Sequence, residues 1–209
     1  RRDRQGRDLP ALCDAIVTPF PWSAKLLQAM GADAHFFGHP LKQMVRATPE
    51  AGERTGIAVL PGSRDAEIAL HLPLIARAME GRSERLEFAV AERLSTEWKR
   101  VAPHRTDDRF TEGDTYGVFL RAQAAIVCSG TATLEAALCR CPTVVIYRIG
   151  PLVELQLRLV RVTFDFISQP NILLQRAALP ELIQHDATAP ALRAALDPLL
   201  TETPARAAC

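Results

Sequence analysis

The sequence has almost no excess of charge of either sign. Its 209 residues include 25 Lys and Arg and 24 Asp and Glu, which gives a formal net charge of +1. A protein that binds duplex nucleic acid normally needs a clustered basic face, so this balance argues against nucleic acid as the main partner. The basic cluster of Arg1, Arg2, Arg4 and Arg7 lies at the terminus, and we interpret it as a solvated or frayed helix end.

Long apolar runs are also absent. No uninterrupted apolar segment approaches the roughly 20 residues that a helix needs to cross a bilayer, and no signal peptide is recognisable. Internal repeats and low-complexity segments are missing too. The composition, 48% hydrophobic and 23% charged, is that of an ordinary globular α/β protein. Because the chain opens with Arg1 rather than Met, in a polar stretch, we expect it not to be a whole gene product.

The cysteines do not have the spacing of a zinc site. The chain contains five of them, at positions 13, 128, 139, 141 and 209, and only one residue separates Cys139 from Cys141. A zinc site would show a two-residue gap and a second pair. Cys128 and Cys139 lie in apolar sequence and are interpreted as small core residues. We expect a reducing cytosolic environment.

The first part of the chain has the pattern of a single βαβ unit. Residues 14–19 predict a short buried strand, residues 23–30 a helix that ends at Gly31, and residues 34–37 a second strand. Residues 47–55 are polar and rich in turn formers, which is typical of a linker. We therefore place a domain boundary there.

Beyond the linker, apolar strands alternate with helix-forming segments. Strands are predicted at 57–60, 86–90, 124–128 and 143–147, and helices at 73–80, 95–101, 116–123, 131–139 and 189–200. Pro73 is expected to open its helix, with 65–72 as a separate short turn, because proline is costly inside a helix. This alternation predicts an α/β fold with a Rossmann-like parallel sheet and helices on both faces.

Residues 151–162 fit two patterns. Alternating apolar residues there would suit a half-buried strand, whereas a stripe of Leu152, Leu155 and Leu159 suits a helix. The good helix formers favour the helix. Its apolar side chains, interleaved with Arg158 and Arg161, would suit either core packing or an anionic membrane surface, and we favour core packing.

Two strand–turn–helix junctions carry the chemical signal. Ser-Gly-Thr at 129–131 follows one predicted strand, and Pro-Gly-Ser-Arg at 61–64 follows another. The first N–H groups of a helix have no intrahelical partner and attract anions, and Arg64 adds a fixed cation. Either turn alone is common in βαβ units. Together they would face one crevice, because all strands of a parallel sheet end at the same edge, and a diphosphate or nucleotide would fit there.

These residues, with four further stretches, resemble the lipid A disaccharide synthases, glycosyltransferases of the GT-B type. The matching segments lie at 37–41, 60–68, 129–135, 142–148, 170–173 and 180–182. The resemblance implies two Rossmann-like domains that face a cleft. Residues 1–46 would be the remnant of an N-terminal acceptor domain, 47–55 a linker and 56–209 the C-terminal UDP-sugar-binding domain. The resemblance therefore implies that this chain binds the sugar donor but does not catalyse the transfer by itself.

The resemblance also implies the reaction. The family transfers a hexosyl group, with inversion, from UDP-2,3-diacylglucosamine to 2,3-diacylglucosamine 1-phosphate (lipid X), and releases UDP. It implies no metal and no cofactor, and a cytoplasmic location at the inner face of the inner membrane, with peripheral contact through the lipid substrate. A homodimer is left open. The alternatives are another GT-B UDP-N-acetylglucosamine transferase or epimerase, and a non-catalytic GT-B-like domain.

Carried over to this chain, the resemblance implies nine UDP-sugar contacts. They are Gly62, Ser63, Arg64, Ser129, Gly130, Thr131, Glu135, Tyr147 and Asn171. Residues 62–64 and 129–131 would bind the diphosphate. Glu135 would accept hydrogen bonds from the ribose, or else be a first-turn carboxylate favoured by the helix dipole. Tyr147 would pack near the uracil or in the core, and Asn171 would hold the sugar donor or the lip of the cleft.

The catalytic base is not evident in this sequence. His39, between Gly38 and Pro40, is a candidate, but its position suits a hinge better and no carboxylate partner accompanies it in the sequence. The resemblance places the base in the first domain. The segments 164–169 and 174–177 depart from the family pattern near the expected sugar-donor site, and we expect them to affect acyl-chain or sugar preference.

Overall fold

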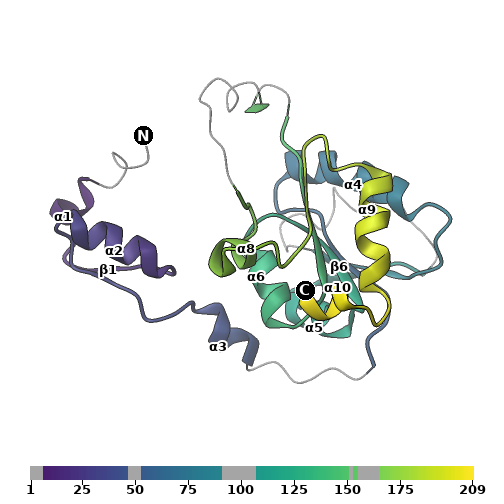
Figure 1. Cartoon of the computed structure of the whole chain (residues 1–209), viewed down its shortest axis with the longest axis horizontal. Helices are drawn as coiled ribbons and strands as arrows, with labels where there is room; N and C mark the ends of the chain where they lie inside the picture. Colours follow the sequence, from purple (N-terminus) through teal and green to yellow (C-terminus); the bar gives the residue numbers. More distant parts are fainter. Residues whose placement is uncertain (1–6, 47–52, 91–106, 151–152, 155–164) are drawn as a thin grey trace. The chain divides into compact units, whose positions relative to one another are not determined.

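The computed structural model describes residues 7–46, 53–90, 107–150, 153–154 and 165–209 (Figure 1). The chain divides into two compact units, residues 1–47 and 48–209. The predicted helix at 95–101 lies outside the described residues, as does most of the segment 151–162.

The first unit contains a small βαβ arrangement, as the sequence predicts. Its elements are α1 (Leu9–Leu12), β1 (Ile16–Val17), α2 (Pro21–Ala29), β2 (Ala34–His35) and α3 (Leu41–Arg46). β1 and β2 pair in parallel, and the Gln28 amide ties α2 to β2 by donating to the Ala34 carbonyl at 2.6 Å. Both strands are shorter than expected. Val17 and Phe37 remain largely exposed, so this unit buries only part of its apolar surface.

The second unit is built on a six-stranded parallel sheet. In spatial order its strands are β5 (Arg109–Glu112), β4 (Leu86–Val90), β3 (Ile57–Leu60), β6 (Ala124–Cys128), β7 (Thr143–Tyr147) and β8 (Glu181–Ile183). Each neighbouring pair is parallel. The four predicted strands are confirmed residue for residue. β5 and β8, the short strands at the two edges, were not predicted.

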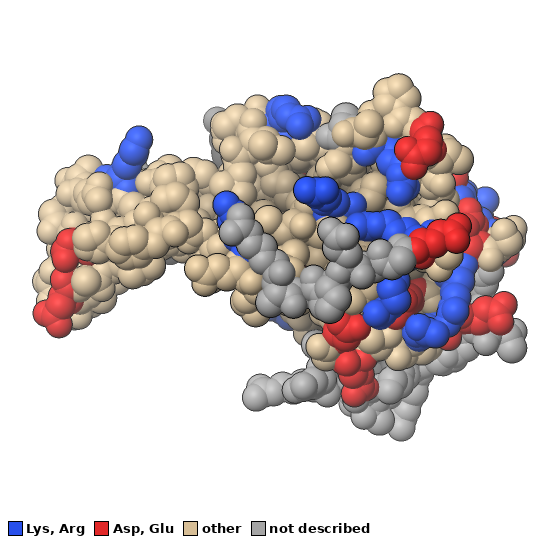
Figure 2. All heavy atoms as spheres, turned by 90° about the horizontal axis from the view of Figure 1, so that it is seen from below, with Lys and Arg blue, Asp and Glu red and all other residues tan. Residues whose placement is uncertain are grey.

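Helices cover both faces of this sheet, which confirms the predicted Rossmann-like α/β class (Figure 1). They are α4 (Asp65–Met79), α5 (Thr115–Arg121), α6 (Thr131–Leu138), α8 (Gln169–Leu174), α9 (Ala189–Leu196) and α10 (Pro204–Ala208), with a 3₁₀ turn, η4, at Asp197–Leu199. α4 and α9 enclose one apolar core with Phe88 and Ile126 of the sheet, and α5 and α6 lie on the other face. Figure 2 shows basic and acidic side chains close together on one face of the molecule.

The prediction of a break before Pro73 was wrong. α4 runs without interruption from Asp65 to Met79 and contains Pro73 in its interior. The missing N–H and the ring of a proline cost about 3 kcal/mol in a helix. That cost is offset because the helix buries Ile68, Leu72 and Ile75 against the sheet, while Pro73 itself faces solvent.

Arg54 connects the beginning of the second unit to the ends of two helices. Its guanidinium donates to the carbonyls of Phe119 and Ala122 at 3.2 and 3.3 Å, at the end of α5, and to that of Cys139 at 2.7 Å, at the end of α6. Carbonyls at a helix C-terminus lack intrahelical partners and carry partial negative charge. The arginine therefore satisfies both helix ends at once.

We predict that Arg54→Ala lowers the free energy of unfolding by about 2 kcal/mol, because helix-end carbonyls lose charged hydrogen bonds. Urea unfolding of the purified chain measures this change. Arg77→Ala, at an exposed position on α4, is the control and should change stability by less than about 0.5 kcal/mol. Equal effects of the two substitutions would contradict the role given to Arg54.

Candidate functional site

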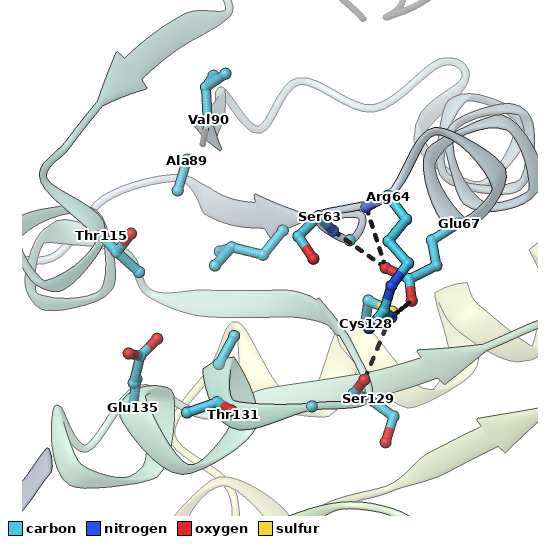
Figure 3. Close-up of a pocket in the computed structure, with 14 residues that line it drawn as sticks. Ser63, Arg64, Glu67, Ala89, Val90, Thr115, Cys128, Ser129, Thr131 and Glu135 are labelled. Atoms are coloured by element: carbon cyan, nitrogen blue, oxygen red, sulfur yellow. Dashed lines mark hydrogen bonds and ion pairs between the residues drawn. The ribbon is translucent and has the colours of Figure 1, made fainter. Parts of the chain in front are cut away.

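A pocket of about 360 Å³ opens at the carboxyl ends of β3, β4 and β6 (Figure 3). The register of the sheet explains its position. Leu60, the last residue of β3, pairs with Val127 of β6, so the turns that follow these two strands lie side by side. The lining residues are Leu60, Gly62, Ser63, Arg64, Glu67, Ala89, Val90, Thr115, Cys128, Ser129, Gly130, Thr131, Ala132 and Glu135.

Seven of the nine predicted contact residues line this pocket. They are Gly62, Ser63, Arg64, Ser129, Gly130, Thr131 and Glu135. Tyr147 and Asn171 are not among the lining residues. Glu67, which lies within the motif at 60–68 but was not among the predicted contacts, also lines the pocket, and its hydrogen bonds give it a role in the site.

Glu67 holds the turn after β3. One carboxylate oxygen, Oε2, accepts from the backbone N–H groups of Ser63 at 3.1 Å and Arg64 at 3.4 Å, and the other, Oε1, accepts from the Arg64 guanidinium at 2.6 Å. Gly62 has φ +130°, and a Cβ there would lie 2.7 Å from both Cβ and Oε2 of Glu67. The expectation that these N–H groups are left for a ligand is therefore corrected, because Glu67 already satisfies them.

Arg64 nevertheless keeps its charge available at the pocket. Its side chain is 77% exposed, and only Nη1 is engaged with Glu67 among the described residues. The hydrogen bond to Glu67 raises the pKa of Arg64 further, so the guanidinium is cationic at every relevant pH. The remaining N–H groups of its planar fork suit a phosphate oxygen.

The turn after β6 presents free backbone N–H groups. Gly130, the N-cap of α6, has an extended backbone, and no side chain of the described residues caps this helix end. The first N–H groups of α6, including those of Thr131 and Ala132, have no intrahelical partner. Gly130 and Thr131 are exposed, so these groups can reach a ligand.

Ser129 has a different part from the one expected. Its backbone N–H donates to the Ile146 carbonyl at 3.1 Å, and its hydroxyl donates to the Ile167 carbonyl at 2.9 Å. Both hydrogen-bond donors are thus used inside the protein. Ser129 ties the end of β6 to the segment before α8 rather than supplying an N–H or O–H donor to a ligand.

Glu135 lies at the other end of the pocket from Arg64. Figure 3 shows it beside Thr115, across from the group formed by Ser63, Arg64 and Glu67. Burial raises the pKa of the Glu135 carboxyl, and the hydrogen bond from the Tyr116 hydroxyl, at 3.5 Å, lowers it in part. A half-buried carboxylate one turn into α6 suits hydroxyl groups, which donate hydrogen bonds without adding charge.

Between these ends the pocket wall is less polar. Leu60, Ala89 and Val90 come from the ends of β3 and β4, and Cys128 ends β6. Burial raises the pKa of the Cys128 thiol to about 12, so it stays protonated and acts as a small apolar wall residue. In the described ranges, no group of three or more His, Cys, Asp and Glu side chains is arranged to hold a metal ion.

Asn171 is a structural residue of the interior, which corrects its assignment to the sugar-donor site. It is fully buried, and its amide nitrogen donates to the Leu179 carbonyl at 2.8 Å and to Glu181 at 2.7 Å. Its oxygen accepts from the N–H groups of Ala178 and Leu179, both at 2.8 Å. All of its hydrogen-bonding capacity on both amide atoms is used to hold the chain between α8 and β8.

His71 joins two turns at the same edge of the sheet. From α4, its buried ring reaches the Pro61 carbonyl through Nδ1 at 2.6 Å, and its Nε2 accepts from the backbone N–H of Arg148 at 2.9 Å. Because Nε2 accepts, Nδ1 must carry the proton, and the ring is neutral. The ring of Tyr147 lies 6.4 Å from that of His71, and Tyr147 is half-buried beside the pocket rather than in its lining.

His39 belongs to the first unit and has local partners there. Its Nδ1 accepts from the backbone N–H of Leu41 at 3.3 Å, and its ring lies 5.9 Å from that of Phe20. These contacts describe a turn residue between β2 and α3. They give no support to a role as general base.

We predict that His71 makes stability depend on pH. Burial lowers the pKa of His71 below 6.5, so the unfolded chain binds more protons than the folded one, and stability falls as the pH drops below about 6.5. Glu67 opposes this shift and Arg148 adds to it. In urea unfolding between about pH 7.5 and 5, His71→Gln should be less stable at the upper end and lose less stability on acidification. Parallel curves for both proteins would refute this assignment.

Comparisons with known proteins agree with the arrangement of the second unit. A S. aureus TarM mutant, solved in complex with fondaparinux, alpha-GlcNAc-glycerol and UDP, superposes with a TM-score of 0.54 at 9% sequence identity, and covers 91% of this chain and 38% of its own. At that identity the likeness is one of fold, the GT-B glycosyltransferase fold. In the described part of the chain, no helix combines the length and apolarity that a membrane span requires.

Relatives known from their sequences are closer. The lipid-A-disaccharide synthases of Pseudomonas putida strain KT2440 and Azotobacter vinelandii are 32% and 35% identical, over 91% and 90% of this chain. That of Syntrophus aciditrophicus is 34% identical over 85%. The matches cover 55%, 54% and 51% of those proteins, so the chain spans about half of their length. The sequence model of the Lipid-A-disaccharide synthetase family matches residues 1–208, and the chain belongs to this family.

Proposed function

We propose that the second unit binds the UDP-sugar donor of a hexosyl transfer. The observation that supports this most is the composition of the pocket. A cation, Arg64, lies at one end and the carboxylate of Glu135 lies at the other, and the N-terminus of α6, which no described side chain caps, lines the pocket with them. A nucleoside diphosphate has the same polarity, with anionic phosphates next to neutral ribose hydroxyls.

The diphosphate end has a chemical purpose in such a transfer. When the bond between the anomeric carbon and the phosphate oxygen breaks, negative charge grows on the departing UDP. A guanidinium and aligned N–H dipoles that are fixed before the reaction stabilise that charge most strongly in the transition state. Arg64 and the first N–H groups of α6 meet this requirement, since neither has to reorganise to face the pocket.

The ribose end would select the nucleotide. Glu135 is the pocket carboxylate on α6, and the Leu60, Ala89 and Val90 side chains give the space beside it an apolar wall. We assign the ribose hydroxyls to Glu135. Tyr147 lies next to the pocket and not in its lining, so we propose only a supporting role for it.

The family to which the chain belongs supports a particular reaction. We propose that the complete enzyme transfers the 2,3-diacylglucosaminyl group from its UDP conjugate to 2,3-diacylglucosamine 1-phosphate, with inversion, in lipid A biosynthesis. Its lipid substrates would bring it to the inner face of the inner membrane as a peripheral protein. The names of the relatives, lipid-A-disaccharide synthases, support this proposal over another UDP-N-acetylglucosamine transferase or an epimerase.

We predict that the chain binds UDP saturably in a calorimetric titration and that Arg64→Ala weakens the binding about tenfold or more, because one charged phosphate contact contributes about 1.5–3 kcal/mol. Uridine, which has no phosphate, should bind weakly and equally to both proteins. Arg77→Ala, on the exposed face of α4, is the matched control. A folded chain that shows no UDP binding would contradict the proposal.

We predict that Glu135→Ala has the complementary pattern. The substitution should weaken UDP and uridine by a similar factor, because it removes a contact to the ribose and leaves the phosphate contacts in place. The same titrations measure both ratios. If UDP weakened while uridine was unaffected, Glu135 would belong to the phosphate end and its assignment to the ribose would be wrong.

A further inference from the structure

The carboxylate of Glu67 occupies the place that an anion would take at the turn after β3. Three N–H donors converge on it, the backbone groups of Ser63 and Arg64 and the Arg64 guanidinium, at 3.1, 3.4 and 2.6 Å. The Glu67 carboxylate is thus an anion in a pocket that we assign to another anion, the diphosphate of a nucleotide. In the sequence this turn resembles an open phosphate loop, but in the structure its donors are already bound to an internal carboxylate.

The surrounding geometry shows that the carboxylate is fitted to this position. The Glu67 side chain is only 15% exposed, although Arg64 beside it is 77% exposed. Gly62 leaves room for it, since any side chain there would collide with its Cβ and Oε2 at 2.7 Å. The glycine in the turn is therefore explained by the approach of Glu67, without any approach of a phosphate.

We propose that Glu67 is an internal counter-anion of the sugar-donor site, which keeps the turn ordered while the site is empty and weakens the binding of UDP by competing for Arg64. The inference rests on the proposed function, because it assigns the competing anion to the diphosphate of a nucleotide. Glu67 is a positioning residue on this account. It touches Arg64 and the turn, and takes no part in bond making or breaking.

Electrostatics gives the direction of the effect. A carboxylate and a diphosphate have the same sign, so each lowers the affinity of the site for the other, most strongly where little water separates them. With Glu67 ionised, Arg64 and Glu67 together add no net charge to the diphosphate end. The attraction that remains comes from the N-terminus of α6 and the outer N–H groups of Arg64. Such a site holds its shape without ligand and releases UDP more readily than an unpaired arginine would.

The test is a calorimetric titration of UDP and uridine into the wild-type chain and Glu67→Gln, which keeps the shape and an acceptor oxygen but removes the charge. We expect UDP affinity to rise ~10-fold and uridine affinity to stay unchanged, since the charge acts only on the phosphates. Glu202→Gln is the matched control. This substitution also removes a carboxylate that is paired with an arginine, Arg206. Arg206 donates to the carbonyl of Gln123 at the amino end of β6, which is the end opposite the pocket.

Two further variants separate charge from shape. Glu67→Asp retains the charge and should not raise UDP affinity, whereas Glu67→Ala removes it and should raise affinity even though the turn loses its cap. The gain from Glu67→Gln should shrink when Arg64→Ala is already present, because the competition is for that guanidinium. Circular dichroism confirms that each variant is folded, and Glu67→Ala replaces Glu67→Gln if the latter is not.

The possible results distinguish the counter-anion role of Glu67 from the proposed binding of UDP. Wild-type binding with equal or weaker binding by both uncharged variants would overturn the counter-anion role and leave the sugar-donor site standing. A matching rise for uridine would also overturn it, because the effect would then not act on phosphate. No UDP binding by any variant would overturn the proposed function and this inference with it.

Discussion

The parallel pairing of β3 with β6 is the constraint on which the site depends. The register that places Leu60 opposite Val127 brings two turns, 61–64 and 129–131, to one edge of the sheet although they are far apart in the chain. Their backbones then form two sides of one pocket. In a parallel sheet this edge is also where the next helices begin, so the positive end of the α6 dipole lines the same pocket as Arg64. The chemistry of the pocket is a consequence of this topology.

Internal hydrogen bonds then decide which groups of that edge remain for a ligand. Glu67 uses the N–H groups of the first turn, the ring of His71 ties that turn to the end of β7, and Ser129 is bound to the segment before α8. Among the described residues, the outer face of the Arg64 guanidinium and the start of α6 still face the pocket. A turn that such hydrogen bonds hold in place loses little conformational entropy on binding. The site is therefore rigid at its rim and selective about which donors it presents.

The sequence was informative where the pattern is local and less so where partners are distant. Three of the four central strands, β3, β6 and β7, are apolar runs with glycine or proline near their ends, and all four strands were predicted at the right residues. β5 could not be found that way, since Arg109–Glu112 has a single aromatic residue among polar ones and pairs only as an edge strand. The predicted break before Pro73 was wrong because the burial of α4 against the sheet outweighs the low helix propensity of proline. The hydrogen-bond partners of Glu67 and Asn171 could be found only in the structure. The Glu67 side chain folds back over the turn that precedes its own helix. Asn171 donates a hydrogen bond to Glu181, ten residues away.

The central claim is that one pocket, at the carboxyl ends of β3, β4 and β6, binds the nucleotide of the sugar donor in a single orientation. A crystal structure of the chain grown with UDP tests this most directly. The account predicts the diphosphate between the guanidinium of Arg64 and the first N–H groups of α6, with the ribose hydroxyls at Glu135 and the turn at 61–64 unchanged. A nucleotide bound elsewhere on the folded chain, or one with its ribose at Arg64 and its phosphates at Glu135, would contradict the account.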